Sequence, residues 1–328
     1  MELELKFPVL MVKFQRPAEL MYEFGKKHER VFKRIGDIST LVGVVGMVVA
    51  TALLMKGAVG VVMGGPAQVG LVVPGVRIPG SPIYIPLVEG LIAVFLLAVF
   101  HEGMHGITAA AEGLKAKYAA FIAFLFIPAA GVEIDEKKMK KKGKLTRLRI
   151  FSAGSMGNFI LALLCFGLLF PAGAVVEKFV DYSGLKVLNS TNLDLHPGDV
   201  IVSINGRSTK SVEELRDVLK EIGPGGTVEV KTTNSTVYGR LTGEGKLGVY
   251  LQPLVEYRGW TGGLLGFIAR VLVISVQLNL GVGIMNLLPL GILDGGRIMA
   301  ELCEKYHRLA SIVVTALLVV NLVGPYLF

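Results

Sequence analysis

The chain has 328 residues, of which 52% are hydrophobic and only 18% are charged, and its mean hydropathy is +0.60. A soluble domain carries about 25% charged residues, so this composition excludes an ordinary soluble protein. The net charge of +8 does not indicate nucleic-acid binding, because the basic residues concentrate beside apolar runs. Those runs are long enough to cross a bilayer, and we therefore expect a lipid bilayer and no nucleic acid as partner.

The N-terminal residues 1–36 are amphiphilic and end in a basic cluster, and an apolar run follows at about residues 38–63. Residues 64–86 are rich in glycine and proline, which predicts two short extended pieces around a Pro-Gly turn. A second apolar run covers about residues 87–111. Basic residues beside a span favour the cytoplasmic side, so we expect a cytoplasmic N-terminus.

The next part of the chain is apolar, then strongly basic, then apolar again. Residues 118–133 are short and interrupted by proline, and we interpret them as a re-entrant or interfacial segment that does not span. Residues 137–149 carry eight Lys and Arg residues and predict a solvated cytoplasmic loop. The third expected span covers about residues 148–171.

Residues 172–258 have shorter apolar runs and more polar residues, which indicates a separate soluble domain between spans. An alternating stretch ends at Asn205-Gly206, a pair that predicts a strand followed by a tight turn. Ser211 and Glu214 have the spacing of a capping box, which predicts a helix to about residue 222.

Two further apolar runs begin near residues 261 and 309 and complete five expected spans. The positive-inside pattern sets their directions. It places residues 172–258 outside the cytoplasm and the carboxyl end of the second span near the cytoplasmic face.

The second expected span contains the sequence His101-Glu102-Gly103-Met104-His105. On a helix, this pattern puts both imidazoles on one face, one turn apart, which suits two nitrogen ligands of one zinc ion with Glu102 beside the open position. Charged and metal-ligating side chains are costly in lipid and indicate function there. The alternatives are a chance match and histidines that serve packing or proton relay.

Two histidines do not hold a catalytic zinc alone, because such sites have three protein ligands. Asp294 is the best third ligand, since it interrupts another apolar segment and is followed by Gly295 and Gly296. We expect these glycines to let the backbone turn sharply and bring the carboxylate inward. Glu102 then serves as the base that takes a proton from water. The alternative for Asp294 is a tight turn after a span.

Glu89 and Arg270 are charges inside expected spans that the motif does not use. Helical rise puts both toward the outer end of their spans at similar depth. Charges in spans pair or reach water. Glu89 and Arg270 approach each other and tie the second span to the fourth, each extends separately to the outer interface, or each has some other partner.

These motifs resemble those of the site-2 protease family of intramembrane zinc metalloproteases. The pair formed by H-E-x-x-H and the N-L-L-P…L-D-G-G stretch at residues 286–296 carries the resemblance. Residues 73–79, 126–133 and 147–154, with Asn158, resemble further motifs of the branch that contains the sterol-regulatory enzyme. Residues 172–258 resemble the PDZ domain that many members carry.

The resemblance implies zinc held by His101, His105 and Asp294, with Glu102 as general base and Asn286 engaging the substrate backbone. It implies substrates that are transmembrane proteins, first cleaved by another protease, and a multi-pass protein of the cell membrane. The PDZ-like domain either captures peptides and selects substrates or is a spacer.

The predicted fold is a polytopic α-helical membrane protein of about five spans, three of them a core around the zinc site. Its parts are a cytoplasmic N-terminus (1–36), membrane segments at 37–171 and 259–328, and an extracytoplasmic α/β PDZ-like domain (172–258). The predicted function is cleavage of transmembrane segments in regulated intramembrane proteolysis. An inactive membrane scaffold or chaperone that binds partners through the PDZ-like domain is the alternative, and a metal transporter is a third possibility.

Overall fold

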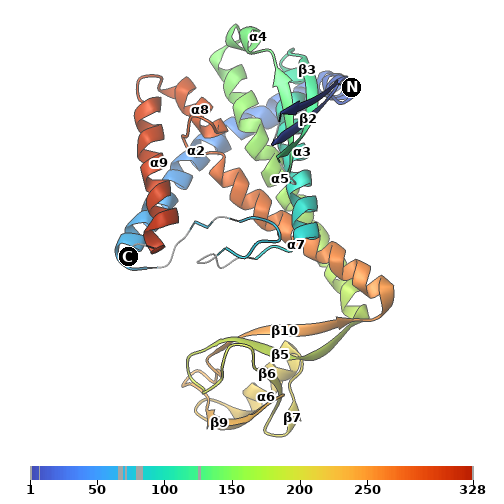
Figure 1. Ribbon diagram of the computed structural model, residues 1–328, viewed down its shortest axis with the longest axis vertical. Helices are drawn as coiled ribbons and strands as arrows, with labels where there is room; N and C mark the ends of the chain where they lie inside the picture. The colour runs from blue at the N-terminus through green and yellow to red at the C-terminus, as the bar shows by residue number, and fades with distance from the viewer. Residues whose placement is uncertain are drawn as a thin grey trace. The chain divides into compact units, whose positions relative to one another are not determined.

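Figure 1 shows the computed structural model, which describes residues 2–6, 8–65, 69–70, 72–78, 84–124 and 127–326. The chain forms two compact units, one made of Met1–Phe170 with Ala269–Phe328 and the other of Pro171–Ile268. Three predicted segments fall partly outside the described residues. They are the extended pieces at 64–86, the segment at 118–133 and the end of the fifth expected span.

Four helices among the described residues are long and apolar enough to cross a membrane: α2 (Glu29–Val62), α3 (Leu87–Ala111), α5 (Lys144–Val176, continued to Phe179 by η1, Glu177–Phe179) and α7 (Gly259–Met285). The expected spans coincide with them, although α2 begins well before residue 38. The fifth expected span corresponds to α9 (His307–Val323), which is followed by η2 (Gly324–Tyr326). At 17 residues, α9 is about 26 Å long and shorter than a hydrocarbon core of about 30 Å.

A four-stranded antiparallel sheet lies at one end of the first unit. Its order is β1 (Glu2–Lys6), β2 (Val9–Phe14), β3 (Ala116–Phe124) and β4 (Ile127–Ile134). The segment predicted as re-entrant or interfacial is thus the β3–β4 hairpin. The N-terminal residues, for which no strands were predicted, pair with it through β2 and β3, from Val9 opposite Phe124 to Phe14 opposite Ala119.

The amphipathic helix α1 (Gln15–Lys27) joins this sheet to α2 and packs on α3. The packing is close because glycines meet the neighbouring helix: a Cβ on Gly25 would lie 2.5 Å from the Ile107 carbonyl oxygen, and one on Gly106 would lie 2.7 Å from Met21 Sδ. The N-terminal segment therefore supports the helix that carries the histidines. Between the sheet and α5 lies α4 (Glu136–Lys140), whose first turn is capped by the Asp135 carboxylate.

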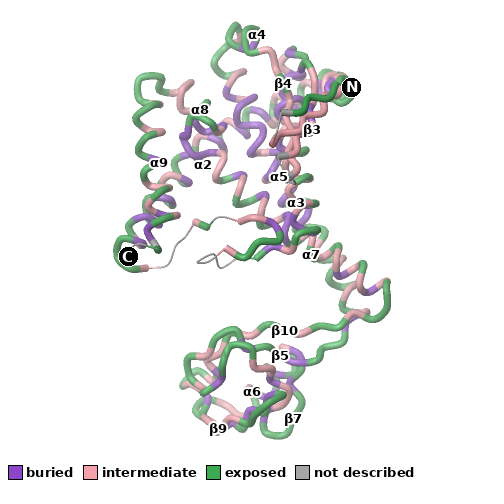
Figure 2. The backbone as a smooth tube through the Cα atoms, viewed as in Figure 1, coloured by how far each residue is buried: buried purple, intermediate pink, exposed green. Residues whose placement is uncertain are grey.

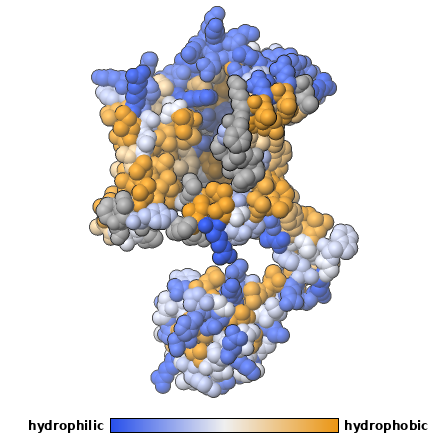
Figure 3. All heavy atoms as spheres, in the orientation of Figure 1, coloured by the Kyte–Doolittle hydropathy of each residue, from blue (hydrophilic) through white to orange (hydrophobic). Residues whose placement is uncertain are grey.

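The outward faces of the long helices in the first unit are apolar. Large exposed side chains include Leu41 and Val48 of α2 and Leu163 and Phe170 of α5. Figure 3 shows hydrophobic residues over the sides of this unit and hydrophilic residues gathered at the end that carries α4. An outward apolar surface of this kind is what lipid contact requires, so the protein is embedded in a membrane.

Buried residues lie inside the first unit, as the purple stretches of α2 and α5 show (Figure 2). One buried cluster joins Met47 of α2, Ile150 and Phe151 of α5 and Ile298 of α8 (Asp294–Leu302). Ala109 of α3 belongs to the same cluster, so α3 and α8 are packed together through α5 and α2.

Glu89 of α3 and Arg270 of α7 form an ion pair, with Arg270 Nε 3.0 Å from Glu89 Oε1. The Glu89 side chain is only 11% exposed. Of the alternatives for these charges, pairing is confirmed, and separate extension of each to the interface is wrong. The pair ties the second span to the fourth.

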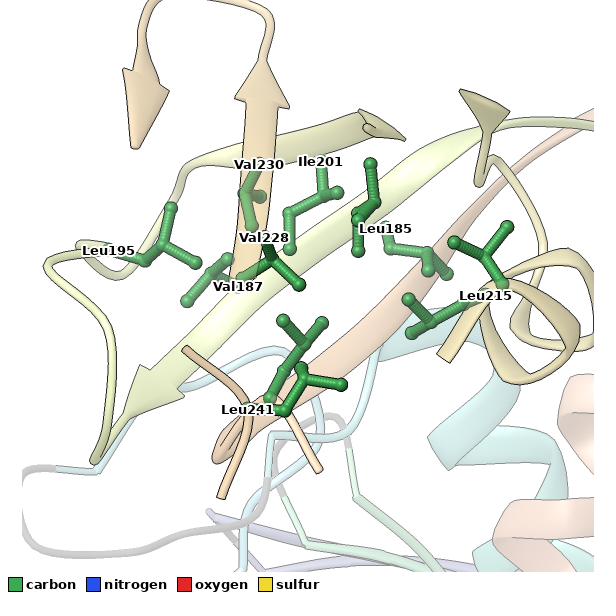
Figure 4. Packing of buried hydrophobic residues seen from close by; sticks show 11 residues of the cluster. Leu185, Val187, Leu195, Ile201, Leu215, Val228, Val230 and Leu241 are labelled. Atoms are coloured by element: carbon green, nitrogen blue, oxygen red, sulfur yellow. The ribbon is translucent and has the colours of Figure 1, made fainter. Parts of the chain in front are cut away.

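Within the second unit, residues 180–257 form a six-stranded antiparallel sheet with one helix. Its strands run in the order β10 (Val249–Tyr257), β5 (Val180–Ser190), β6 (Val200–Ile204), β8 (Thr227–Thr232), β9 (Thr236–Arg240), and β7 (Arg207–Ser208) pairs with β6. The helix is α6 (Val212–Ile222). Figure 4 shows the core that they share, in which Leu185, Val187 and Ile201 are fully buried.

Two local predictions in this unit are confirmed. The β6–β7 turn has Asn205 at φ 49° and Gly206 at φ 76°, which is the left-handed pair that a type I′ turn needs. Ser211 Oγ accepts the backbone N–H of Glu214 at 3.1 Å and begins α6. The Glu214 carboxylate accepts the backbone N–H of Lys210, one residue earlier than the standard capping box.

Candidate metal centre

Three metal-ligating side chains from two helices meet inside the first unit. His101 and His105 lie one turn apart on α3, and their Nε2 atoms are 3.3 Å apart. Asp294, the first residue of α8, places Oδ2 3.2 Å from each of these nitrogens. All three residues are buried. The structure therefore brings together the three ligands that the sequence predicted.

The triangle formed by these atoms has the size of a metal-ligand set. Its sides of 3.2, 3.2 and 3.3 Å match a tetrahedral zinc, for which bonds of ~2.0–2.1 Å put neighbouring ligand atoms about 3.3 Å apart. Asp294 Oδ2 is buried and accepts no hydrogen bond. A buried acceptor without a donor is costly, and a cation bound by the triangle removes that cost.

The tautomer of His105 also suits a metal. Its Nδ1 lies 2.7 Å from the carbonyl oxygen of Ile150 on α5. A carbonyl only accepts, so Nδ1 carries the proton and Nε2 presents a lone pair. Hydrogen bonding of the second ring nitrogen to a backbone carbonyl is the usual support of a histidine ligand.

Gly154 of α5 forms one wall of the site. A Cβ on this residue would lie 2.3 Å from His105 Nε2 and 2.6 Å from His101 Nε2. It would also lie 2.5 Å from His101 Cε1, so a methyl group here would collide with both imidazole rings and displace them. Glycine lets α5 approach the two rings this closely.

The two glycines after Asp294 do not make the turn that the sequence suggested. Both lie in the first turn of α8, and neither has a positive φ. They are needed for close backbone approach: a Cβ on Gly295 would lie 2.1 Å from the Leu287 carbonyl oxygen and one on Gly296 would lie 1.9 Å from that of Leu290. The Gly295 N–H donates to the Asn286 carbonyl oxygen at 2.8 Å, which fixes the start of α8 against the preceding loop.

Two arginines at the start of α5 connect the ligand helices. Arg147 makes two hydrogen bonds to Glu301 of α8, through Nε at 2.8 Å and Nη2 at 2.7 Å. Arg149 bonds Glu112, which follows α3, at 2.7 Å and also bonds Asp37 of α2. Because Ile150 lies next to them, this turn of α5 holds α3, α8 and the His105 ring in one arrangement.

Glu102 lines a cavity of about 490 Å³ together with the three ligands. Its Oε2 accepts the backbone N–H of Val132 on β4 at 3.0 Å. The hairpin therefore orients this carboxylate, although sequence reasoning gave the segment no such role. Asn286, predicted to bind substrate, also lines the cavity and is half-buried.

Sequence reasoning missed several contributors to the site. Gly154 and Asn158 were noted only as parts of a resembling motif, and Ile150 and Val132 act through backbone atoms that no side-chain pattern reveals. Arg297 also lines the cavity, with its guanidinium 5.7 Å from the centre of the Phe151 ring. Its position three residues after Asp294 is the one signal that could have pointed to it, because residues three apart share a helix face.

The fold and the site define a membrane-embedded helical protein with a buried His-His-Asp group suited to a metal ion. The model of peptidase family M50 matches residues 89–323, more than two thirds of the chain. The chain belongs to this family of membrane zinc metallopeptidases.

Two curated relatives are similar to parts of this chain. An uncharacterized protein of Methanocaldococcus jannaschii is 31% identical over 218 residues, which are 64% of this chain and 56% of that protein. The membrane-bound transcription factor site-2 protease homolog of Arabidopsis thaliana is 30% identical over 172 residues, which are 50% of this chain and 32% of the plant protein. The matches thus span about half of the first relative and a third of the second.

Proposed function

We propose that the protein is a zinc-dependent intramembrane endopeptidase that cleaves transmembrane segments of membrane-anchored proteins. The observation that carries this proposal is the triangle of His101, His105 and Asp294 with Glu102 in the same cavity. Family membership supports peptidase chemistry, and the apolar outer surface of the surrounding helices supports a site within the membrane.

In the proposed reaction, three residues bind the zinc ion and Glu102 transfers the proton. When bound, zinc supplies Lewis acidity and lowers the pKa of a water molecule toward about 7. His101 and His105 would hold it through Nε2, and Asp294 would hold it through Oδ2. Glu102 accepts the proton of the attacking water and returns it to the leaving amine. Its Oε2 is held by the Val132 N–H, which leaves the other carboxylate oxygen for the proton transfer.

The substrates we propose are transmembrane proteins that another protease has first cleaved, in regulated intramembrane proteolysis. Asn286 supports substrate binding because it lines the cavity beside the metal ligands, where an amide can bond an extended backbone. The proposed topology has five spans in the cell membrane, with α9 as a short fifth, a cytoplasmic N-terminus and the second unit outside the cytoplasm. The basic residues before α2 and α5 support this direction.

The second unit is proposed to be PDZ-like and to select substrates. Its antiparallel sheet with a single helix, α6, supports this assignment. Strand addition of an extended peptide to a sheet edge is the general mode for such domains.

Purified full-length protein in proteoliposomes, given a single-span model substrate, tests the proposed function. We expect one zinc per chain, cleavage within the apolar segment mapped by mass spectrometry, loss of cleavage when a chelator removes the zinc, and recovery on adding zinc back. Cleavage that continues after elemental analysis shows the metal to be gone would reject a zinc mechanism. A zinc-loaded chain that cleaves no substrate of a varied panel would favour the scaffold alternative.

A further inference from the structure

Asn158 of α5 is a completely buried amide that contacts a metal ligand from behind. It is 0% exposed, and its Nδ2 lies 3.2 Å from His101 Nδ1. Its Oδ1 is buried with no hydrogen-bond partner. A buried polar atom without a partner costs about 1–3 kcal/mol, so the amide is satisfied on one side only, and that side faces His101.

The identity of the amide atom that faces His101 decides the tautomer of this ligand. If Nδ2 donates to Nδ1, neutral His101 carries its proton on Nε2, which points toward His105 Nε2 and Asp294 Oδ2. If Oδ1 accepts from Nδ1, the proton is on Nδ1 and Nε2 presents a lone pair. The two ends of a carboxamide have the same shape, and their hydrogen bonds alone determine its orientation.

A metal bound by the triangle requires the second arrangement, because a protonated Nε2 cannot coordinate. We infer that Asn158 is a positioning residue for the metal site, which accepts the His101 Nδ1–H through Oδ1 and fixes the ring as an Nε2 ligand. Asn158 thereby does for His101 what the Ile150 carbonyl does for His105. This inference rests on the proposed metal site and adds a residue to it.

A hydrogen bond from His101 to Asn158 Oδ1 also explains why residue 158 is an amide although it lies between apolar helices. Asn158 Cβ is 3.3 Å from the Cβ that would be added at Gly283 of α7, so the residue is enclosed between α5, α7 and the His101 ring. A side chain there that does not accept a hydrogen bond leaves the His101 Nδ1–H buried and unpaired. Loss of such a partner costs about 10–100-fold in metal affinity.

Two variants of similar shape distinguish the role of Asn158 as a hydrogen-bond acceptor from a role in packing alone. Asn158→Leu keeps the branched shape of the side chain and removes every hydrogen bond. Asn158→Asp keeps an acceptor and removes the donor. Zinc affinity of each purified full chain is measured by competition with a chromogenic chelator. We expect Asn158→Leu to bind zinc about 10–100-fold more weakly and Asn158→Asp to bind as tightly as wild type or more tightly. A purely structural role predicts the opposite order, because Asp buries a charge.

Asn279→Leu is the matched control. Asn279 is also 0% exposed, but its Nδ2 donates to the Ser275 carbonyl oxygen of its own helix at 2.8 Å, so we expect unchanged zinc affinity. In wild-type protein labelled with ¹⁵N-histidine, His101 is expected to show a protonated Nδ1, a readout that needs no variant to fold.

Asn158→Leu with wild-type zinc affinity, Asn158→Asp as weak as Asn158→Leu, or an unprotonated His101 Nδ1 would each overturn the inference. These three results count against the inference alone when the wild-type chain binds zinc. A wild-type chain that binds no zinc overturns the proposed function itself and the inference with it.

Discussion

Glu102→Gln is expected to remove most of the cleavage activity while zinc remains bound. The change removes the base but none of the three ligand atoms. Glutamine can still accept the Val132 N–H through its amide oxygen, so the carboxamide keeps the position of the carboxylate. General acid–base catalysis contributes about 10²–10⁴-fold, and we expect a loss of that size in the cleavage rate of a model transmembrane substrate, with one zinc per chain by elemental analysis.

The matched control for this variant is Glu89→Gln, the same change on the same helix. Glu89 lies 13 residues before Glu102, about 20 Å along α3, and its partner is Arg270. The rate constant of this variant should stay near the wild-type value at a temperature where both proteins are folded. Near-wild-type cleavage by Glu102→Gln would show that another group is the base.

Gly154→Ala is expected to eliminate metal binding without disrupting the helix. Alanine favours a helix over glycine by about 1 kcal/mol, but its methyl group would lie 2.3 Å from His105 Nε2 and 2.6 Å from His101 Nε2. His105 cannot easily turn away because its Nδ1 bonds Ile150. We expect zinc affinity to fall by at least about 100-fold, the upper end of what loss of a supporting contact costs, and cleavage to stop.

Gly167→Ala provides the control on the same helix. A Cβ at residue 167 meets nothing within 4 Å, so this variant should retain zinc and activity. Circular dichroism checks that both variants stay helical. A helical Gly154→Ala protein with one zinc per chain would show that the two rings accommodate the methyl group and still bind the metal.

The sequence predicted those features that depend on neighbouring residues. The helix at 87–111, the Asn205-Gly206 turn and the Ser211 cap arise from local periodicity, backbone freedom and a short-range hydrogen bond, and the structure has each of them. The ligand set could be predicted because imidazole and carboxylate side chains are the groups that bind zinc, and the sequence shows them directly at His101, His105 and Asp294.

Features that depend on distant pairing could not be predicted. Strand β2 finds its partner β3 about a hundred residues later, and no local pattern in residues 9–14 indicates that pairing. The Glu102 contact uses a backbone N–H of β4, and every non-proline residue has one. The Glu89–Arg270 pair was predictable only as one of three alternatives, because depth along two helices does not fix how each helix is rotated about its axis.

The metal site cannot assemble until long after its first two ligands have been synthesised, because the third ligand lies far along the chain. Asp294 follows His105 by 189 positions, and at ribosomal rates of about 5–20 residues per second this interval takes about 10–40 s. During that time a newly inserted chain has Glu102 and both histidines but no third ligand, so we expect it to lack both zinc and peptidase activity. A chain that ends before residue 290 is accordingly expected to insert into the membrane yet hold no zinc, and stoichiometric zinc in such a truncated chain would contradict this delay.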